Sequence, residues 1–257
     1  MEEVTTPIHQ ILILDDYSNY TLPKTVDTVR ESIPGKYILW SEERIVSLLK
    51  SNFDGSVLRA YNNVKANALK ADLARYCILY TYGGWYFDLL MTVDGDLAHY
   101  NLNDYDMLVF RDLPIGDKSI LPVSNSIIWV KDTHNPILKD TIDMCVENIL
   151  NEIYPKTSHR ITGPGVLGIA VARKCLEDET VKILVGDLSF CNENNSGEFT
   201  IASWPKRKRV HFAWHKLPGF ELDLPEHYQK GSKYHSMYME KDLYKGNGYS
   251  QKNRGNA

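Results

Sequence analysis

One stretch of the chain constrains its fold more than any other: Ala71–Tyr76, a double glycine, and then Trp85–Asp88. Apolar residues around the first segment recur at helical spacing with alanine and lysine between them, which predicts a helix over residues 62–81. Gly83–Gly84 cannot extend that helix cheaply and allows the positive φ of a tight reversal. Because the aromatic run that follows is β-prone, we expect a strand that ends at Asp88.

Three charged side chains of this stretch are candidates for a binding site. Asp72 and Arg75 are three residues apart, so on a helix they lie side by side at the edge of the buried face. Asp88 follows a strand, and ligands of open α/β sheets collect outside the carboxyl ends of strands. On these residues alone a plain interpretation stays open, in which the pair is a surface ion pair of little energetic value and Asp88 caps its strand.

Elsewhere short apolar runs alternate with helical patterns. We expect strands at Ile11–Leu14, Tyr37–Trp40, Met107–Phe110, Ile127–Val130 and Val181–Leu184, and helices over residues 23–33, 136–153 and 164–175. Ser41 is expected to cap a further helix that begins with two glutamates. This alternation predicts an α/β fold with a mostly parallel sheet flanked by helices.

The sequence pattern changes near residue 186, where polar loop signals and scattered aromatic residues replace the alternation of strand and helix patterns. We therefore expect residues 1–185 to form the core and residues 186–245 a C-terminal lobe or lid of the same domain. Residues 246–257 are polar and contain glycine, which predicts a disordered tail.

The composition is that of one soluble enzyme domain. The 257 residues are 43% hydrophobic and 24% charged, and a net charge of -4 gives no reason to expect nucleic acid or an anionic membrane as the main partner. No apolar run approaches the roughly 18 residues needed to span a bilayer, and the acidic start of the chain lacks a secretory pattern. We expect a cytoplasmic chain, with a peripheral place at a membrane left open.

The cysteines fit the same picture. They are far apart and form no C-x-x-C pair, which favours free thiols in a reducing compartment and does not suggest zinc: Cys77, Cys145, Cys175 and Cys191. Cys77 lies on the buried face of the predicted helix and is expected to pack in the core.

The central stretch resembles the DxD glycosyltransferases related to initiating mannosyltransferases, to bacterial capsular-polysaccharide transferases and, more distantly, to the large glucosylating toxins. Their pattern runs S-D-x-x-R-Y and then G-G-x-Y-x-D-x-D. Further matches lie in the same order along the chain: Ile8–Gln10, Tyr37–Glu43, Asn125–Ile128, His134–Pro136 and Thr162–Pro164. The resemblance covers roughly residues 7–175 and implies a GT-A-type nucleotide-sugar-binding fold.

The resemblance also implies a reaction and its residues. The reaction is transfer of a hexose from a nucleotide-diphosphate sugar to a hydroxyl of a glycan, a lipid-linked or a protein acceptor, with retention at the anomeric carbon. Asp72 and Arg75 would contact sugar hydroxyls, and Asp88 would hold the ribose or a metal. The implied donor-binding set further contains His9, Gln10, Gly83, Gly84, Tyr86, Gly163, Pro164 and His235.

One position departs from the family pattern. Leu90 stands where the second acid of D-x-D belongs, and leucine has no lone pair for a hard cation. This leaves Asp88 as the first candidate ligand for the manganese or magnesium that the family implies. A literal D-x-D at Asp94–Asp96 is six residues out of register, so Asp96 belongs to a turn or is an additional metal ligand.

Several alternatives stay open. Without a metal, Arg75, Lys70 and helix-terminal N–H groups would carry the phosphate charge, and the basic run Lys206–Arg209 is a solvated loop or a contact for the diphosphate. With Leu90 in place of an acid, the chain can also be a catalytically silent sugar-binding module. Gly163–Gly168 spells G-x-G-x-x-G, but it lacks a preceding strand, which disfavours a nicotinamide-dependent oxidoreductase.

Overall fold

The sheet and its covering helices are described for residues 6–14, 21–32, 36–94, 102–112, 123–192, 198–203, 211–215 and 234–246 of the computed structural model. Within these ranges the strands form one nine-stranded sheet in the order β2-β1-β3-β6-β5-β7-β8-β9-β4. Their bounds are β1 Ile8–Ile11, β2 Tyr37–Trp40, β3 Gly84–Phe87, β4 Met91–Val93, β5 Met107–Arg111, β6 Val123–Val130, β7 Ile183–Asn192, β8 Glu198–Ser203 and β9 His211–His215.

The sheet is mixed. β1 pairs in parallel with β2 and with β3, and β5 pairs in parallel with β7. The other pairings are antiparallel, including the two that join β6 to β3 and to β5. The α/β class expected from the sequence, with helices flanking the sheet, is confirmed.

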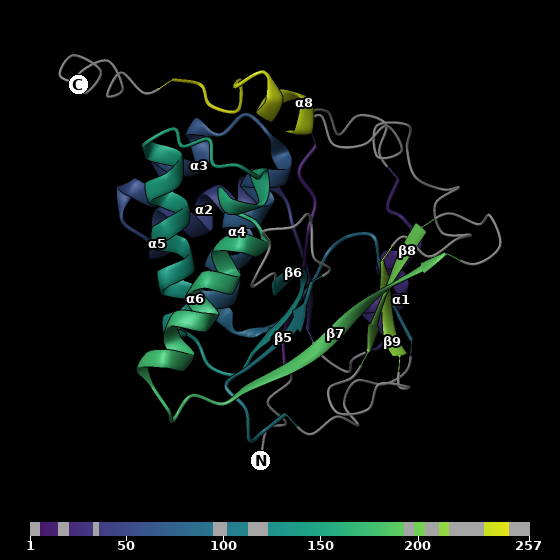
Figure 1. Cartoon of the computed structure of the whole chain (residues 1–257). Helices are drawn as coiled ribbons and strands as arrows, with labels where there is room; N and C mark the ends of the chain where they lie inside the picture. Colours follow the sequence, from purple (N-terminus) through teal and green to yellow (C-terminus); the bar gives the residue numbers. More distant parts are fainter. Residues whose placement is uncertain are drawn as a thin grey trace.

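Most helices cover one side of this sheet (Figure 1). Their bounds are α1 Thr25–Ser32, α2 Glu42–Asn52, α3 Gly55–Asn63, α4 Asn67–Tyr82, α5 Pro136–Leu150, α6 Pro164–Glu177 and α8 Tyr234–Met239. α2 to α6 gather on one side, whereas α1 lies on the other side with β8 and β9. Ser41 caps α2 as predicted, because its side chain accepts a hydrogen bond from the Arg44 N–H.

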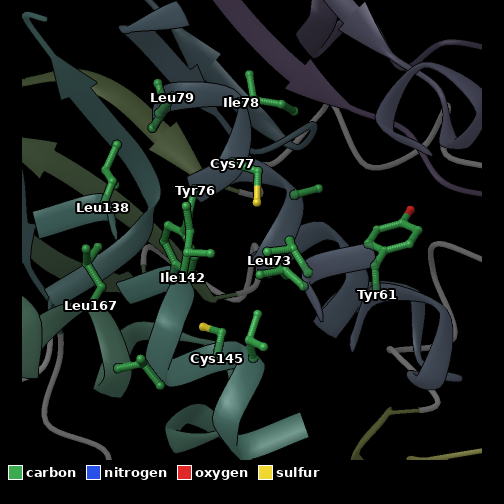
Figure 2. Close-up of a cluster of buried hydrophobic side chains, with 14 of the residues drawn as sticks. Tyr61, Leu73, Tyr76, Cys77, Ile78, Leu79, Leu138, Ile142, Cys145 and Leu167 are labelled. Carbon is green, nitrogen blue, oxygen red and sulfur yellow. The ribbon is translucent and has the colours of Figure 1, made fainter. Parts of the chain in front are cut away.

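The main core lies between the helical layer and the sheet (Figure 2). Residues of α4, α5 and α6 meet there, among them Leu73, Cys77, Ile142 and Leu167, each with 0% exposure. The thiol of Cys77 therefore packs in the core as expected, and burial raises its pKa well above the usual range. α4 runs through the middle of this core, so its central turns are buried on nearly every side.

Several boundaries differ from the sequence prediction: β6 begins at Val123 rather than Ile127, and β7 is Ile183–Asn192 rather than Val181–Leu184. The first strand is Ile8–Ile11 rather than Ile11–Leu14, so His9 and Gln10 lie inside it. The helix expected over residues 62–81 begins at Asn67, and a separate helix, α3, ends at Asn63. Residues of the C-terminal segment fill that break: the N–H of Lys65 donates to the Leu243 carbonyl, and Val64 forms a bridge with Tyr244.

β6 contains an irregularity that positions the site. Along the β5–β6 ladder, Leu108 pairs with Trp129 and Phe110 pairs with Ser124, so β5 advances two residues while β6 advances five. Extra residues in one strand form a bulge, which redirects side chains and is common beside active sites. Asn125 and Ser126 lie in this bulge.

Candidate functional site

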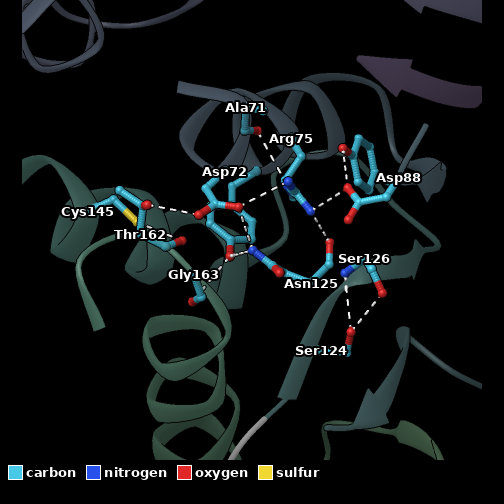
Figure 3. A network of polar contacts seen from close by, with 12 residues as sticks. Ala71, Asp72, Arg75, Asp88, Ser124, Asn125, Ser126, Cys145, Thr162 and Gly163 are labelled. Carbon is cyan, nitrogen blue, oxygen red and sulfur yellow. Dashed lines mark hydrogen bonds and ion pairs between the residues drawn. The ribbon is translucent and has the colours of Figure 1, made fainter. Parts of the chain in front are cut away.

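The centre of the candidate site is Arg75, which α4 carries at the edge of the sheet. Its side chain is only 6% exposed, so the surface ion pair considered from the sequence is the wrong interpretation. The guanidinium contacts two carboxylates: Nη2 is 3.0 Å from Asp72 Oδ1, and Nη1 is 2.8 Å from Asp88 Oδ1. Nη1 also donates to the Asn125 carbonyl at 2.5 Å, and the guanidinium carbon lies 4.6 Å from the Tyr86 ring centroid. Figure 3 shows Asp72, Asp88 and Asn125 converging on Arg75.

The ionisation of this cluster follows from its contacts. Burial by itself would lower the pKa of Arg75, but Asp88, Tyr86 and Asp72 outweigh it and hold that pKa above its ordinary value. The guanidinium is therefore a permanent cation between two carboxylates. Burial raises the pKa of the Tyr86 hydroxyl well above its ordinary value, so this hydroxyl stays protonated and donates to Asp88 Oδ1 at 2.8 Å.

Asp72 is fully occupied by protein donors. Its Oδ1 accepts from Asn125 Nδ2 at 2.8 Å as well as from Arg75, and its Oδ2 accepts from the Thr162 hydroxyl at 3.0 Å. Burial raises the pKa of Asp72, and the neighbouring Arg75 opposes that shift. A Cβ placed on Gly163 would lie 3.5 Å from Asp72 Oδ2, so the start of α6 closes this side of the carboxylate.

Asp88 is the more open of the two carboxylates. Its side chain is 29% exposed, against 17% for Asp72. The backbone fixes its position, because its N–H donates to the Ser126 carbonyl at 2.8 Å and its carbonyl accepts from Gln10 Nε2 at 3.1 Å. Oδ1 accepts from Arg75 and Tyr86, whereas Oδ2 accepts no hydrogen bond from the part of the chain described here. This outward oxygen can therefore contact a ligand.

The double glycine and His9 hold the strand that carries Asp88. Gly83 and Gly84 adopt φ of 63° and 86°, and a Cβ on Gly84 would lie 2.3 Å from the Pro7 carbonyl oxygen. His9 Nδ1 accepts from Trp40 Nε1 at 3.2 Å, so Nε2 carries the proton and donates to the Gly83 carbonyl at 3.1 Å. Burial lowers the pKa of His9 to about 4, which keeps the ring neutral. Both ring nitrogens of His9 thus serve the framework.

A cavity of about 190 Å³ adjoins this network at the bulge of β6. The residues that line it come from several strands and the segments beside them: Met91, Asp112, Ser124, Asn125, Ser126, Leu188 and His215. Asn125 belongs to both regions, since its amide reaches Asp72 and its backbone carbonyl reaches Arg75. The cavity is therefore connected to the two carboxylates through Asn125.

The other predicted residues are less closely connected to Arg75. Gly163 caps α6 and Pro164 begins it, after a 3-10 turn rather than a strand, so the dinucleotide motif fails in the structure as expected. His235 is exposed on α8 and makes no described contact with the three charged residues. Asp96 and Lys206–Arg209 lie outside the described residues.

Lys70 does not face the site. Its Nζ is 2.6 Å from Glu42 Oε1 and 5.4 Å from the centroid of the Tyr61 ring. These contacts tie α4 to α2 and α3. The metal-free alternative therefore loses one of the cations on which it depended.

Sequence reasoning assigned no role to Asn125 and Thr162, although both lie in matched motifs. Each reaches Asp72 from a distant part of the chain, Asn125 through the β6 bulge and Thr162 through the turn before α6. A polar residue next to an apolar strand was the available signal for Asn125. Ser126 lies in the same motif and carries the same signal, whereas Ser124 lies outside the motif; both line the cavity.

A divalent cation finds few protein ligands at this edge. Among the described residues no group of three or more His, Cys, Asp or Glu side chains could hold a metal ion. The outward oxygen of Asp88 is one suitable donor, and Mg²⁺ is commonly held by one or two carboxylates together with substrate phosphates. The residues present therefore fit a cation that is shared with a phosphate ligand.

Comparison with known proteins agrees with this geometry. Residues 18–120, which include Asp72, Arg75 and Asp88, match the profile of the glycosyltransferase sugar-binding region containing the DXD motif. The resemblance to DXD-type glycosyltransferases is confirmed. A solved structure titled PaToxG glycosyltransferase superimposes with a TM-score of 0.51 over 68% of this chain and 71% of its own, at 19% identity, which supports the same fold.

Curated relatives match parts of the chain. Inositol phosphoceramide mannosyltransferases 1 and 3 of Schizosaccharomyces pombe are 36% identical over 93 residues and 30% identical over 135 residues, which is 35% and 52% of this chain. An uncharacterised glycosyltransferase of Acanthamoeba polyphaga mimivirus is 41% identical over 61 residues, or 24% of this chain. The chain spans 24% to 35% of the length of these relatives.

No helix among the described residues is both long enough and apolar enough to cross a membrane.

Proposed function

We propose that this chain is a glycosyltransferase that moves a hexose from a nucleotide-diphosphate sugar to a hydroxyl acceptor with retention of the anomeric configuration. The observation that carries the proposal is the convergence of Asp72, Arg75 and Asp88 at one sheet edge. A cytoplasmic location is part of the same proposal. Because two of the relatives are named mannosyltransferases, mannose is the first hexose to test.

Each of the three residues has a distinct part in this proposal. Arg75 is held rigidly between two carboxylates: Nη1 donates to Asp88 and Asn125 and Nε to Ala71, so Nη2, which also contacts Asp72, keeps one fixed N–H for a ligand, and a preorganised donor of this kind stabilises developing charge. Asp88 offers its outward oxygen to the donor. Asp72, with both oxygens occupied, orients Arg75 and Asn125. Fixed positions of this kind reduce the entropy cost of bringing the two substrates together.

The reaction is proposed to proceed by displacement on the front face of the sugar. Asp72 accepts three side-chain donors, so its oxygens are not placed as a covalent nucleophile, and the open oxygen of Asp88 is assigned to the ribose or the cation rather than to the anomeric carbon. The bond from the anomeric carbon to the phosphate oxygen breaks, the bond to the acceptor oxygen forms on the same face, and the acceptor proton passes to the leaving phosphate. Isolation of a covalent glycosyl-enzyme would contradict this route.

A divalent cation, manganese or magnesium, is proposed as cofactor. The edge holds two carboxylates against one guanidinium, which disfavours an incoming diphosphate by charge. Asp88 would hold the cation together with the donor phosphates. The chemistry that a cation supplies there is neutralisation of charge on the leaving diphosphate.

The test is release of free nucleotide from a panel of uridine- and guanosine-diphosphate hexoses, with manganese, with magnesium and with chelator. We expect release from at least one donor, faster with a metal than with chelator, and loss of release in Arg75→Met. Donor binding is measured in parallel by thermal shift. If one donor binds but no condition releases nucleotide, transfer is rejected.

The second candidate is a catalytically silent module that binds a nucleotide sugar or glycan, and Leu90 is the observation that favours it. Leu90 lies in the tight turn that joins β3 to β4, in which the Met91 N–H donates to the Asp88 carbonyl at 2.9 Å. An apolar side chain thus occupies a half-buried place next to the candidate cation ligand. Binding of donor without release of nucleotide is the outcome that this candidate predicts.

A further inference from the structure

α1 covers the open edge of β4, the strand that follows the turn after Asp88. In the order of the described strands β4 comes last and pairs with β9 alone. The Asp94 N–H donates to the Phe212 carbonyl of β9 at 2.9 Å, so the N–H of Val93, one residue earlier, faces the opposite edge. Backbone groups on such an edge need partners from another element. In this sheet the covering element is a helix.

Two threonines of α1 take the place of a neighbouring strand. The Thr25 hydroxyl donates to the Leu89 carbonyl at 2.6 Å, and the Thr28 hydroxyl accepts from the Val93 N–H at 3.2 Å. Residues three apart share one face of a helix, so both hydroxyls can reach the same segment. The Thr28 hydroxyl also donates to the Thr25 carbonyl at 2.7 Å. α1 is therefore bonded at two points to the chain that runs from the β3–β4 turn into β4.

The two bonds hold different parts of that segment. Leu89 directly follows Asp88 in the tight turn, whereas Val93 lies at the end of β4. Thr25 and the Leu89 side chain are both buried. The carbonyl of Asp88 accepts from Gln10 Nε2 at 3.1 Å. Side chains of β1 and α1 thus hold two consecutive carbonyls of the turn that carries Asp88.

We propose that Thr25 is a positioning residue, which orients the outward oxygen of Asp88 by holding the next carbonyl of the turn. This inference rests on the proposed glycosyl transfer, in which that oxygen contacts the donor. Asp88 and Leu89 are adjacent residues of one turn, so release of the Leu89 carbonyl lets the carboxylate shift relative to Arg75. A misplacement of about 1 Å can cost about 100-fold in rate. Thr28, which holds Val93, has a structural role.

The experiment compares matched variants of the two threonines. Thr25→Val and Thr28→Val each remove one hydroxyl of α1 at nearly unchanged side-chain volume, and each takes a partner from one backbone group of the same segment. Thr25→Ser keeps the hydroxyl and is the rescue variant. Nucleotide release is measured at saturating donor, well below the unfolding temperature, with the donor that wild type turns over fastest. Donor affinity is measured in parallel by thermal shift.

We expect kcat for nucleotide release to fall about tenfold in Thr25→Val and to stay within about twofold of wild type in Thr28→Val and Thr25→Ser. Both valine variants should unfold at a temperature lower by about 3–6 °C, because each loses one hydrogen bond to the backbone. A structural role alone would lower the unfolding temperature without this difference in kcat. If Thr25→Val does not fold, Thr25→Ala replaces it, with the same expected fall in kcat.

A double-mutant cycle identifies the group through which Thr25 acts. Asp88→Asn should slow nucleotide release by about 100-fold. If the Thr25 hydroxyl acts by orienting Asp88, Thr25→Val in the Asp88→Asn background should slow release further by less than about twofold. A further loss of about tenfold would show that the two residues act independently, and would overturn the proposal.

Two other results would overturn it: equal losses of kcat in Thr25→Val and Thr28→Val, or no loss in either. Absence of nucleotide release by wild type from any donor is a different result, which rejects the proposed function. Donor affinity then decides whether Thr25 positions the turn. Weaker binding in Thr25→Val than in Thr28→Val supports the inference, whereas equal binding in both, or no binding by wild type, overturns it.

Discussion

The two carboxylates beside Arg75 belong to regions of different character. Asp72 faces α6 and accepts protein donors on both oxygens, with 17% of its side chain exposed. Asp88 stands at the sheet edge with 29% exposed and presents one oxygen outward. One guanidinium serves both, so the same ion pair is structural on the Asp72 side and available to a ligand on the Asp88 side.

This asymmetry shows how a buried guanidinium can stay paired while a neighbouring carboxylate keeps one oxygen open. An unpaired buried guanidinium would be costly, and pairing with a saturated carboxylate reduces that cost. The second carboxylate can then keep an oxygen free. Stability should therefore depend mainly on the Asp72 side of the ion pair, and activity mainly on the Asp88 side.

The largest expected effect comes from removal of the shared cation. Arg75→Met leaves two carboxylates without their partner in a buried setting, and the free energy of unfolding should fall by about 3–5 kcal/mol. Urea denaturation at pH 7 measures this change. Arg173→Met is the matched control, because Arg173 pairs with Asp140 at 46% exposure and such pairs contribute about 1 kcal/mol or less. Equal losses in the two variants would show that burial of Arg75 has no energetic consequence.

The next effect is on activity. Asp88→Asn removes the charge of the outward oxygen, and nucleotide release should slow by about 100-fold, equivalent to about 2.7 kcal/mol. Its free energy of unfolding should change by less than about 1 kcal/mol.

Asp72→Asn is the matched variant on the structural side. An amide there points an N–H at existing donors, so the free energy of unfolding should fall by about 2 kcal/mol. Steady-state kinetics and urea denaturation of both variants test the contrast. The proposed contrast between the two carboxylates is wrong if Asp88→Asn loses more free energy of unfolding than Asp72→Asn.

Local patterns in the sequence were enough to predict the elements at the centre of the site. The Asp72–Arg75 spacing, the double glycine and the aromatic strand each depend on neighbours along the chain, and the structure places all three as expected. Asn125 and Thr162 could be quoted but not assigned a role, because their contacts depend on a bulge and on the packing of α6 against α4. Long-range geometry of this kind leaves no periodic signal.

The errors in the fold have physical causes of the same sort. The sequence predicts β1 three residues too late because two buried polar residues, His9 and Gln10, interrupt its apolar pattern, and only their distant partners, Gly83 and Tyr37, explain that burial. The break between α3 and α4 was missed because the chain stays helix-prone across it. A C-terminal segment satisfies the backbone of Lys65 at the break, nearly two hundred residues later in the chain.

A smaller effect extends the comparison to the framework beneath Asp88. The pKa of His9 is about 4 in the folded chain against an ordinary 6.5. Between pH 4 and pH 6.5 the unfolded chain therefore binds a proton at His9, whereas the folded chain does not. The stability linked to His9 is complete above about pH 6.5 and is lost as the pH falls toward 4. At pH 5 the loss should be about 2 kcal/mol. His9→Gln, compared by urea denaturation at pH 7 and pH 5, should lack this part of the pH dependence. An equal loss in both proteins would assign it to other groups.

The smallest expected effect concerns Leu90, which lies in the turn just after Asp88, the more exposed of the two carboxylates. Leu90→Asp adds a second hard oxygen ligand beside Asp88, so the manganese concentration for half-maximal nucleotide release should fall about tenfold. Leu90→Asn, which offers an oxygen without charge, should shift it less. In chelator the added carboxylate makes the edge more negative, so donor binding by Leu90→Asp should be weaker than in wild type. Tighter binding with metal and weaker binding without it, measured by thermal shift across a manganese titration, is the pattern expected of a cation shared between Asp88 and the diphosphate. Weaker binding under both conditions would mean that no cation lies there, and that the open oxygen of Asp88 contacts the donor directly.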